Sequence, residues 1–287
     1  MTLELILAAF GGGLLGAVIG ALPAFIFTGF IGLVGVAVIA AGGPEIILND
    51  ITFGALFGPH IAFAGGVAAA AYAANKKKVL DSGMNTLIPL SKYRDAGILI
   101  VGGVFGVLGL GINYLYSTIL VLQTDTIAMT VVTSGIIARL VFGNTGLFGK
   151  MIPADDEVAA ASELNRRRYF PDLKTLGLNI IIGLGLGLVV SYVVILTNIG
   201  PFGFCVSAAS LMFAQMGFSI PATHHITLVA GLAAIATGNI FIGAAFAILS
   251  AILFEIAALI FNSNCDSHID PPATAIFICA FIIFAVF

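Results

Sequence analysis

Long runs of apolar residues, separated by short polar segments, make up most of the chain. A helix needs about 20 mostly apolar residues to cross the hydrocarbon core of a bilayer. By that criterion the pattern predicts about ten transmembrane spans, at residues 3–22, 24–42, 52–75, 96–119, 124–145, 175–197, 199–217, 219–238, 240–262 and 270–287. Several spans begin at or near a proline, which suits the first helical turn because its missing N–H would be unpaired there anyway.

The composition supports an all-α polytopic membrane protein. The 287 residues are 60% hydrophobic and only 9% charged, whereas soluble domains carry about 25% charged residues. Three Cys exclude a disulfide-rich scaffold, and a net charge of −3 gives no reason to expect a nucleic-acid partner. The lipid bilayer is the expected partner. The 35 Gly suit close helix packing, and the stripe Gly12, Gly16 and Gly20 fits either packing within the chain or a homo-oligomer.

The few charges cluster in two segments, 76–95 and 146–174, which together hold ten of the 11 basic residues. These segments follow the third and fifth predicted spans, so they lie on the same side of the membrane. Loops rich in Lys and Arg stay in the cytoplasm. The sequence therefore predicts a multi-pass plasma (inner) membrane protein with both loops cytoplasmic and both termini extracytoplasmic. The apolar run from Leu3 lacks the basic flank and cleavage site of a signal peptide.

The two halves of the chain resemble each other. An offset of 165 residues aligns His60 with His225 and Gly66 with Gly231, and an offset of 141 aligns Gly102 with Gly243 and Asp125 with Asp266. The difference between the offsets (165 − 141 = 24) is about the length of the loop 76–95, which the second half lacks. The pattern predicts a first five-span repeat at 1–145, a charged cytoplasmic linker at 146–174 and a second five-span repeat at 175–287.

An odd number of spans per repeat inverts the second repeat relative to the first. The arrangement resembles, over nearly the whole chain, the five-plus-five inverted-repeat architecture of many secondary transporters and some channels. This resemblance implies a site at the repeat interface, formed by broken or proline-started helices.

Three histidines lie in apolar surroundings at or near the start of predicted spans: His60, His224 and His225. Imidazole is costly in hydrocarbon and usually faces a cavity or the bundle interior. At equivalent places in inverted repeats, His60 and His225 would converge on one site and shuttle protons or bind a metal. The alternative is that each ring hydrogen-bonds a backbone carbonyl at a helix start.

A second polar group precedes the last predicted span and contains Cys265, Asp266, His268 and Asp270. With His224, these mixed N, O and S donors suit a divalent transition metal ion, as transported solute or as bound ligand, and no other cofactor is predicted. The alternative for Asp270, which precedes two prolines, is an N-cap of the last helix. Asp125 would cap the fifth span in the same way.

Two further charges lie within predicted spans. Glu255 is the most deeply placed carboxylate and is a candidate proton or cation site; the alternative is a hydrogen bond to a neighbouring Asn or Tyr. Arg139 lies close to the cytoplasmic end of the fifth span, where snorkelling to the interface is the favoured interpretation and an anionic partner the alternative.

These observations predict a transporter or channel for a small solute, with a cation as the expected class, either a divalent transition metal or a proton-coupled cation. The predicted binding residues are His60, His225, Asp125, Asp266 and Glu255, with His224, His268, Asp270 and Cys265 as metal donors. No HExxH, GxSxG, Walker A or CxxC motif is present, so no enzyme is predicted. The alternatives are a membrane-embedded metal-dependent enzyme and a structural subunit of a larger complex.

Overall fold

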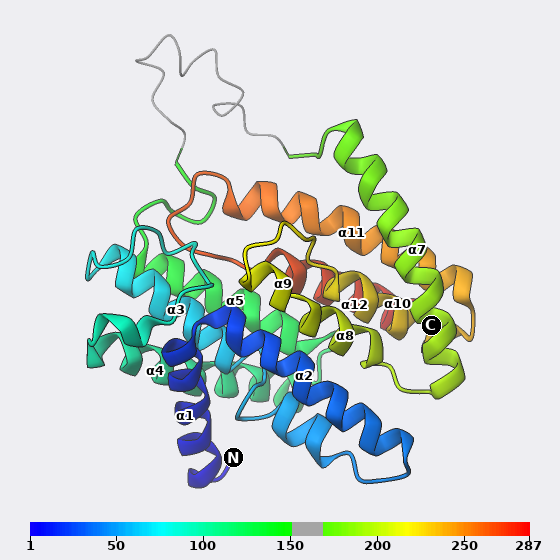
Figure 1. Cartoon of the computed structure of the whole chain (residues 1–287), viewed down its shortest axis with the longest axis horizontal. Coiled ribbons are helices and arrows are strands. Elements are labelled where there is room, and N and C mark those ends of the chain that lie inside the picture. Colours follow the sequence, from blue (N-terminus) through cyan, green and yellow to red (C-terminus); the bar gives the residue numbers. More distant parts are fainter. Residues whose placement is uncertain (151–168) are drawn as a thin grey trace.

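The computed structural model describes residues 1–150 and 169–287, and in these two ranges every regular element is a helix (Figure 1). The first half contains α1 (Leu3–Ile19), α2 (Ala21–Ala40), η1 (Ile47–Thr52), α3 (Ala62–Asn75), η2 (Leu90–Tyr93), α4 (Ala96–Tyr114), η3 (Leu115–Ile119) and α5 (Thr126–Phe142). The second half contains α7 (Leu173–Thr197), α8 (Phe202–Ser210), α9 (Met212–Gln215), α10 (His224–Thr237), α11 (Ile240–Asn262) and α12 (Pro271–Val286). Most of the predicted linker 146–174 lies outside the described residues.

In the part of the chain that the structure describes, four helices are long and apolar enough to cross a membrane: α2, α4 continued by η3, α7 and α11. The all-helical membrane class predicted from the sequence agrees with this finding. The ten full-length spans are not confirmed, because α1, α5, α10, α12 and the pair α8–α9 are shorter apolar helices of 10–17 residues.

Two of the predicted spans contain a short helix preceded by non-helical chain. In the predicted span 52–75, α3 begins only at Ala62, and in the predicted span 219–238, α10 begins only at His224. Pro59 and Pro221 lie in these non-helical stretches, and a proline disfavours helical geometry in the residue before it. Each helix has 14 residues, about 21 Å at 1.5 Å per residue, and so is shorter than the hydrocarbon core of about 30 Å.

The helices of the two halves make corresponding contacts. α1 packs against α3 and α4, and α7 packs in the same way against α10 and α11. α3 contacts α5, as α10 contacts α12. The halves meet where α2 crosses α8 and where α5 packs against α12 (Figure 1). The first contact joins the second helix of each half, and the second contact joins the last helix of each half.

Individual close contacts repeat with the offsets that the sequence shows. A Cβ at Gly109 of α4 would lie 1.7 Å from the carbonyl oxygen of His60, so only glycine fits there. In the second half, the Ser250 hydroxyl of α11 donates to the carbonyl oxygen of His225 at 3.1 Å. Because 109 and 250 differ by 141 and 60 and 225 differ by 165, the two contacts occupy the same place in their halves.

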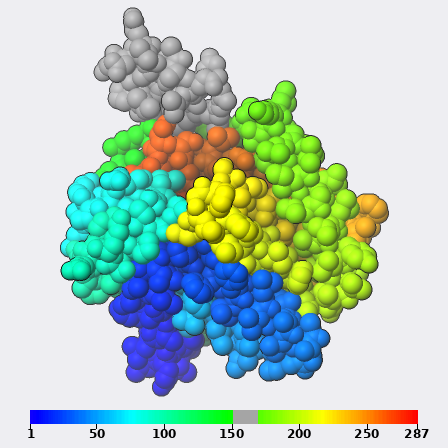
Figure 2. Space-filling model, in the orientation of Figure 1, coloured from blue at the N-terminus to red at the C-terminus, as the bar shows by residue number. Residues whose placement is uncertain are grey.

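Aromatic side chains pack where the halves meet. The ring of Phe25 on α2 makes edge-on contacts with Phe63 of α3 and Phe204 of α8, with centroid separations of 5.7 and 5.6 Å. In Figure 2 the segment around residues 205–220 (yellow) occupies the middle of the visible face, between α1–α2 in blue and α7 in green. The second half therefore packs directly on the first.

The connections after α3, α5 and α11 meet at one end of the molecule. The Asn75 amide donates to the carbonyl oxygen of Asp266 at 3.0 Å, and the Lys150 backbone N–H donates to that of Asn264 at 3.3 Å. Gly83 pairs with Ser267 in an isolated bridge. The loop 76–95 therefore lies against the segment before α12.

A polar contact fixes this loop at the start of α4. The Lys77 ammonium lies 2.8 Å from the Asp95 carboxylate, which also accepts the backbone N–H groups of Gly97 and Ile98 as an N-cap. The hydrogen bond from Lys77 lowers the pKa of Asp95, and the two backbone N–H groups lower it further. The same bond raises the pKa of Lys77. Asp95 thus joins the basic loop to a helix end.

Replacing Gly16 with alanine is expected to destabilise the protein by about 1–3 kcal/mol, because a Cβ there would lie 1.9 Å from the carbonyl oxygen of Ala62 and force α1 away from α3. A Cβ at Gly11 on the same helix would have no neighbouring atom within 4 Å, so Gly11→Ala is expected to be neutral or stabilising by about 0.5–1 kcal/mol. Thermal unfolding of both purified variants in detergent tests the pair. Equal effects of the two substitutions would contradict the packing of α1 on α3.

Candidate functional site

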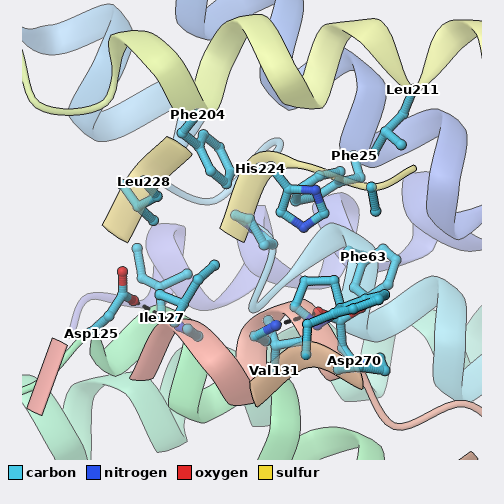
Figure 3. A pocket seen from close by; sticks show the side chains of 18 of the residues that line it. Phe25, Phe63, Asp125, Ile127, Val131, Phe204, Leu211, His224, Leu228 and Asp270 are labelled. Atoms are coloured by element: carbon cyan, nitrogen blue, oxygen red, sulfur yellow. Dashed lines mark hydrogen bonds between the residues drawn. The ribbon is translucent and has the colours of Figure 1, made fainter. Parts of the chain in front are cut away.

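A cavity of about 510 Å³ lies between the two halves (Figure 3). Residues of α2, α3 and α5 form its walls on one side, and residues of α8, α10 and α12 form them on the other. Small-molecule sites usually measure about 300–1,000 Å³ and are mostly apolar with a few polar groups. In size and lining, this cavity fits a small organic molecule.

Four ionisable side chains reach the cavity: Asp125, His224, His268 and Asp270. Figure 3 shows the His224 ring projecting from α10 beside Phe25, with Asp270 across the space and Asp125 towards the opposite end. These four residues were all predicted as candidates from the sequence, and the structure brings them to one cavity.

Corresponding residues of the two halves line the cavity in pairs. The pairs are Asp125 with Asp270, Ala128 with Ala273 and Val131 with Ile276 at an offset of 145 (270 − 125), Phe25 with Phe204 at 179 (204 − 25), and Phe63 with Leu228 at 165 (228 − 63). Similar residues from both halves of the chain therefore wall the cavity. At the offset of 165, Pro59 pairs with His224, and here the two sides differ in polarity.

The structural counterpart of Asp125 is Asp270 rather than Asp266, which the sequence alignment had paired with it. Asp125 caps α5 and Asp270 caps α12. Asp125 and Asp270 are 145 residues apart, four more than the offset of 141, and two of these four residues come from the connection before α12, which spans eight residues, 263–270, whereas six, 120–125, precede α5. An alignment without a gap could not account for the longer connection.

Both aspartates serve as helix caps while lining the cavity. A carboxylate oxygen of Asp125 accepts the backbone N–H of Ala128 at 2.8 Å, and one of Asp270 accepts that of Ala273 at the same distance. The other oxygen of Asp270 lies 3.1 Å from Nε2 of His268. The predicted N-caps are confirmed, and their position on the cavity wall leaves the two carboxylates near any bound molecule.

His224 is buried, 6% exposed, and packs among aromatic rings. Its ring centroid lies 4.7 Å from that of Phe25 and 5.8 Å from that of Phe204. Within the described ranges its Nδ1 has no hydrogen-bond partner. An electrostatic interaction links it with Asp270. A buried imidazole nitrogen without a hydrogen-bond partner is rare in folded proteins and marks this ring for attention.

His60 and His225 do not line the cavity. His225 stacks on Phe254 with a centroid separation of 4.6 Å, and neither of its ring nitrogens is paired with any described residue. His60 is 3% exposed behind the cavity wall. The structure thus places His60 beside α4 and His225 beside α11, each outside the cavity lining. Their predicted role in binding stays a prediction.

Asp266 and Cys265 belong to a different part of the molecule, around Arg139. The guanidinium of Arg139 donates to the carbonyl oxygens of Leu147, Phe261 and Ser267, to the Ser267 hydroxyl and to the Asn262 side chain. Asp266 accepts hydrogen bonds from the Asn144 backbone N–H at 2.6 Å and the Thr145 hydroxyl at 2.9 Å. This network fastens the end of α5 to the connection between α11 and α12.

The favoured interpretation of Arg139, snorkelling to the interface, is wrong. The side chain is 1% exposed, because five acceptors converge on its planar guanidinium inside the molecule. Glu255, half-buried on α11, does not line the cavity although its neighbour Phe254 does.

A metal site is not formed by the predicted donors as the structure places them. Across residues 1–150 and 169–287, no three His, Cys, Asp or Glu side chains come close enough together to hold a metal ion. The predicted metal ion stays a prediction.

Sequence reasoning did not find the aromatic wall of Phe25, Phe63 and Phe204. The chain contains 23 Phe, and nothing in the spacing of these three distinguishes them from the rest. Only the crossing of α2 and α8 brings them together.

Replacing Arg139 with methionine is expected to lower the unfolding free energy by about 3–5 kcal/mol, because the change leaves several buried carbonyl groups and the Asn262 side chain without their donor. Lys92→Met removes an exposed charge and is expected to change it by less than about 0.5 kcal/mol. Chemical or thermal unfolding in detergent measures both variants. A small effect of Arg139→Met would contradict the role assigned to this network.

Comparison with known proteins yields one family-level match. A model of a family of unknown function (DUF7973) matches residues 1–287. No curated protein and no solved structure matches the chain. Because the family model covers the whole chain, the protein belongs to the family of unknown function DUF7973.

Proposed function

We propose that the protein is a membrane carrier that moves a small solute through the cavity between its two halves. One observation carries the proposal: equivalent residues of both halves wall the same cavity, from Phe25 and Phe204 at one position to Asp125 and Asp270 at another. A site at the meeting of two repeats is typical of secondary transporters.

The proposed architecture is a pair of inverted repeats. α1 to α5 correspond to α7, α8–α9, α10, α11 and α12, which gives five helical segments in each half. An odd number of crossings inverts the second repeat. Corresponding helix contacts and recurring residue offsets support this duplication.

α3 and α10 act in this proposal as half-helices. At about 21 Å neither crosses the hydrocarbon core alone. The non-helical chain before each, around Pro59 and Pro221, would complete the crossing. Irregular backbone at membrane depth is tolerated where it lines a cavity, and Pro59 and Ala222 do line it.

The proposed mechanism is alternating access. The halves meet through α2 on α8 and α5 on α12, and both contacts join equivalent helices. A rocking of one half against the other would then open the cavity to one side of the membrane or to the other, with α5 and α12 carrying Asp125 and Asp270 past the solute.

Flux into proteoliposomes tests this function. The probes are radiolabelled choline, lactate and Zn²⁺, each inside or outside the vesicle. The expected result is saturable uptake of at least one probe. Val131→Phe, which places a ring in the cavity, is expected to reduce that flux at least tenfold, because it occupies the volume that the solute needs.

Val141→Phe is the matched control, since Val141 lies on the same helix but is 56% exposed and outside the cavity. It is expected to transport like the unmodified protein. Thermal unfolding checks that both variants are folded. Equal flux in the two variants, or no protein-dependent flux of any probe, would contradict the proposal.

The proposed orientation, with loop 76–95 in the cytoplasm, is tested by cysteine labelling of sealed cells in a Cys265→Ser background, where Cys205 and Cys279 are buried. Glu45→Cys, between α2 and α3, is expected to react with an impermeant thiol reagent from outside. Lys76→Cys, after α3, is expected to react only after permeabilisation. Both positions are exposed on the protein surface. The reverse pattern would refute this orientation.

A further inference from the structure

We infer that the cavity binds an organic ammonium cation with an apolar body, an inference that rests on the proposed function and names its substrate class. Phe25, Phe63 and Phe204 place aromatic rings on its wall, and the two carboxylates Asp125 and Asp270 face the same space. Aromatic faces and carboxylates together form the usual binding environment of such cations.

The charge balance of the lining favours a cation. Among the described residues that line the cavity, Asp125 and Asp270 are the only acidic ones, and the basic ones are His224 and His268, with no Lys or Arg. His268 already lies 3.1 Å from Asp270, so Asp125 is the carboxylate without a basic neighbour in the wall. Each carboxylate caps a helix whose N-terminus carries a partial charge of about +0.5. The helix end therefore offsets only about half of the negative charge of an ionised carboxylate. An anionic solute would meet these carboxylates without any permanently charged basic side chain in the wall.

The aromatic rings select an organic cation over a bare ion. Phe25 contacts both Phe63 and Phe204 edge-on, at 5.7 and 5.6 Å, so its ring lies between the other two. A metal ion would lose its hydration shell against this mostly apolar wall, and the four ionisable side chains do not converge as a ligand set. An alkylammonium group is weakly hydrated and packs against rings through its methyl groups.

His224 gives the site a second recognition element. Its ring extends from α10 to the cavity wall (Figure 3), and its Nδ1, which has almost no accessible surface, is unpaired among the residues described. The corresponding residue in the first half, Pro59, has no polar side chain. A hydroxyl or similar group on the solute would therefore hydrogen-bond on the side of the second half only.

Three ligands of nearly the same shape isolate the effect of charge: choline, its neutral carbon analogue 3,3-dimethylbutan-1-ol, and the anion 3,3-dimethylbutanoate. Binding to the purified full chain in detergent is measured by calorimetry and by thermal shift. Choline is expected to bind at least tenfold more tightly than the alcohol, and the anion most weakly. An alcohol that binds as tightly as choline, or an anion that binds best, would overturn the inference.

Asp270→Asn tests the carboxylate without removing the helix cap, because Asn is also a good N-cap. It is expected to weaken choline binding about tenfold and to leave binding of the alcohol unchanged. Asp172→Asn is the matched control, since Asp172 caps α7 and does not line the cavity. It is expected to leave both affinities unchanged. An unchanged preference for choline in Asp270→Asn would overturn the role of the carboxylate.

His224→Phe keeps the ring and removes the nitrogen, whereas His225→Phe makes the same change one residue away, outside the cavity. Only the first is expected to lower choline affinity, and removing the choline hydroxyl, as in tetramethylammonium, should abolish the difference. Equal effects of the two substitutions would refute the contact with His224.

The two proposals can fail separately. Saturable flux of lactate or Zn²⁺ without choline binding would overturn the substrate class and leave the carrier function standing. Choline binding without flux of any probe would overturn the carrier function and leave the binding site standing.

Discussion

A helix that begins inside an apolar molecule exposes backbone N–H groups that no water can satisfy, and this constraint organises the centre of the protein. α5 and α12 begin there, and Asp125 and Asp270 accept their first N–H groups. α3 begins with backbone bonds from Ala62 to Gly58 and from Ala64 to Pro59. α10 has no side-chain cap at Thr223. At α5 and α12, the carboxylates that satisfy the helix starts are thus the same carboxylates that line the cavity.

Close backbone contacts keep these helix starts in place. Gly16 fits against Ala62 and Gly109 against His60 because neither glycine has a side chain. In the second half, the hydrogen bond from the Ser250 hydroxyl to the carbonyl oxygen of His225 corresponds to the contact of Gly109 with His60. Apolar burial cannot drive helix association in lipid, so close packing and buried hydrogen bonds must position the helices. The cavity depends on this packing, since its walls come from α2, α3 and α5 on one side and from α8, α10 and α12 on the other.

The sequence predicted those features that depend on local chemistry. Scarce charge and long apolar runs gave the membrane class, and the Asp-Pro-Pro run at Asp270 gave the cap of α12. The offsets of 165 and 141 recur in the packing around His60 and His225. The lengths of α3 and α10 could not be predicted from the sequence, because an apolar segment has the same composition whether it is helical or not. The burial of Arg139 and the meeting of three phenylalanines depend on residues distant in the chain, which no local pattern records.

The proposed symmetry and its polar exceptions have different consequences for the carrier. In the proposed carrier, two equivalent halves would supply two arrangements of similar energy, because exchanging the conformations of the halves would restore the same set of contacts. Paired residues such as Asp125 and Asp270 then remain beside the solute in both arrangements. Two histidines of the second half break this equivalence: His224 stands where the first half has Pro59, and His268 has no counterpart in the lining. A solute with a charged end and a polar substituent would therefore be oriented by the second half while its charge is balanced by both.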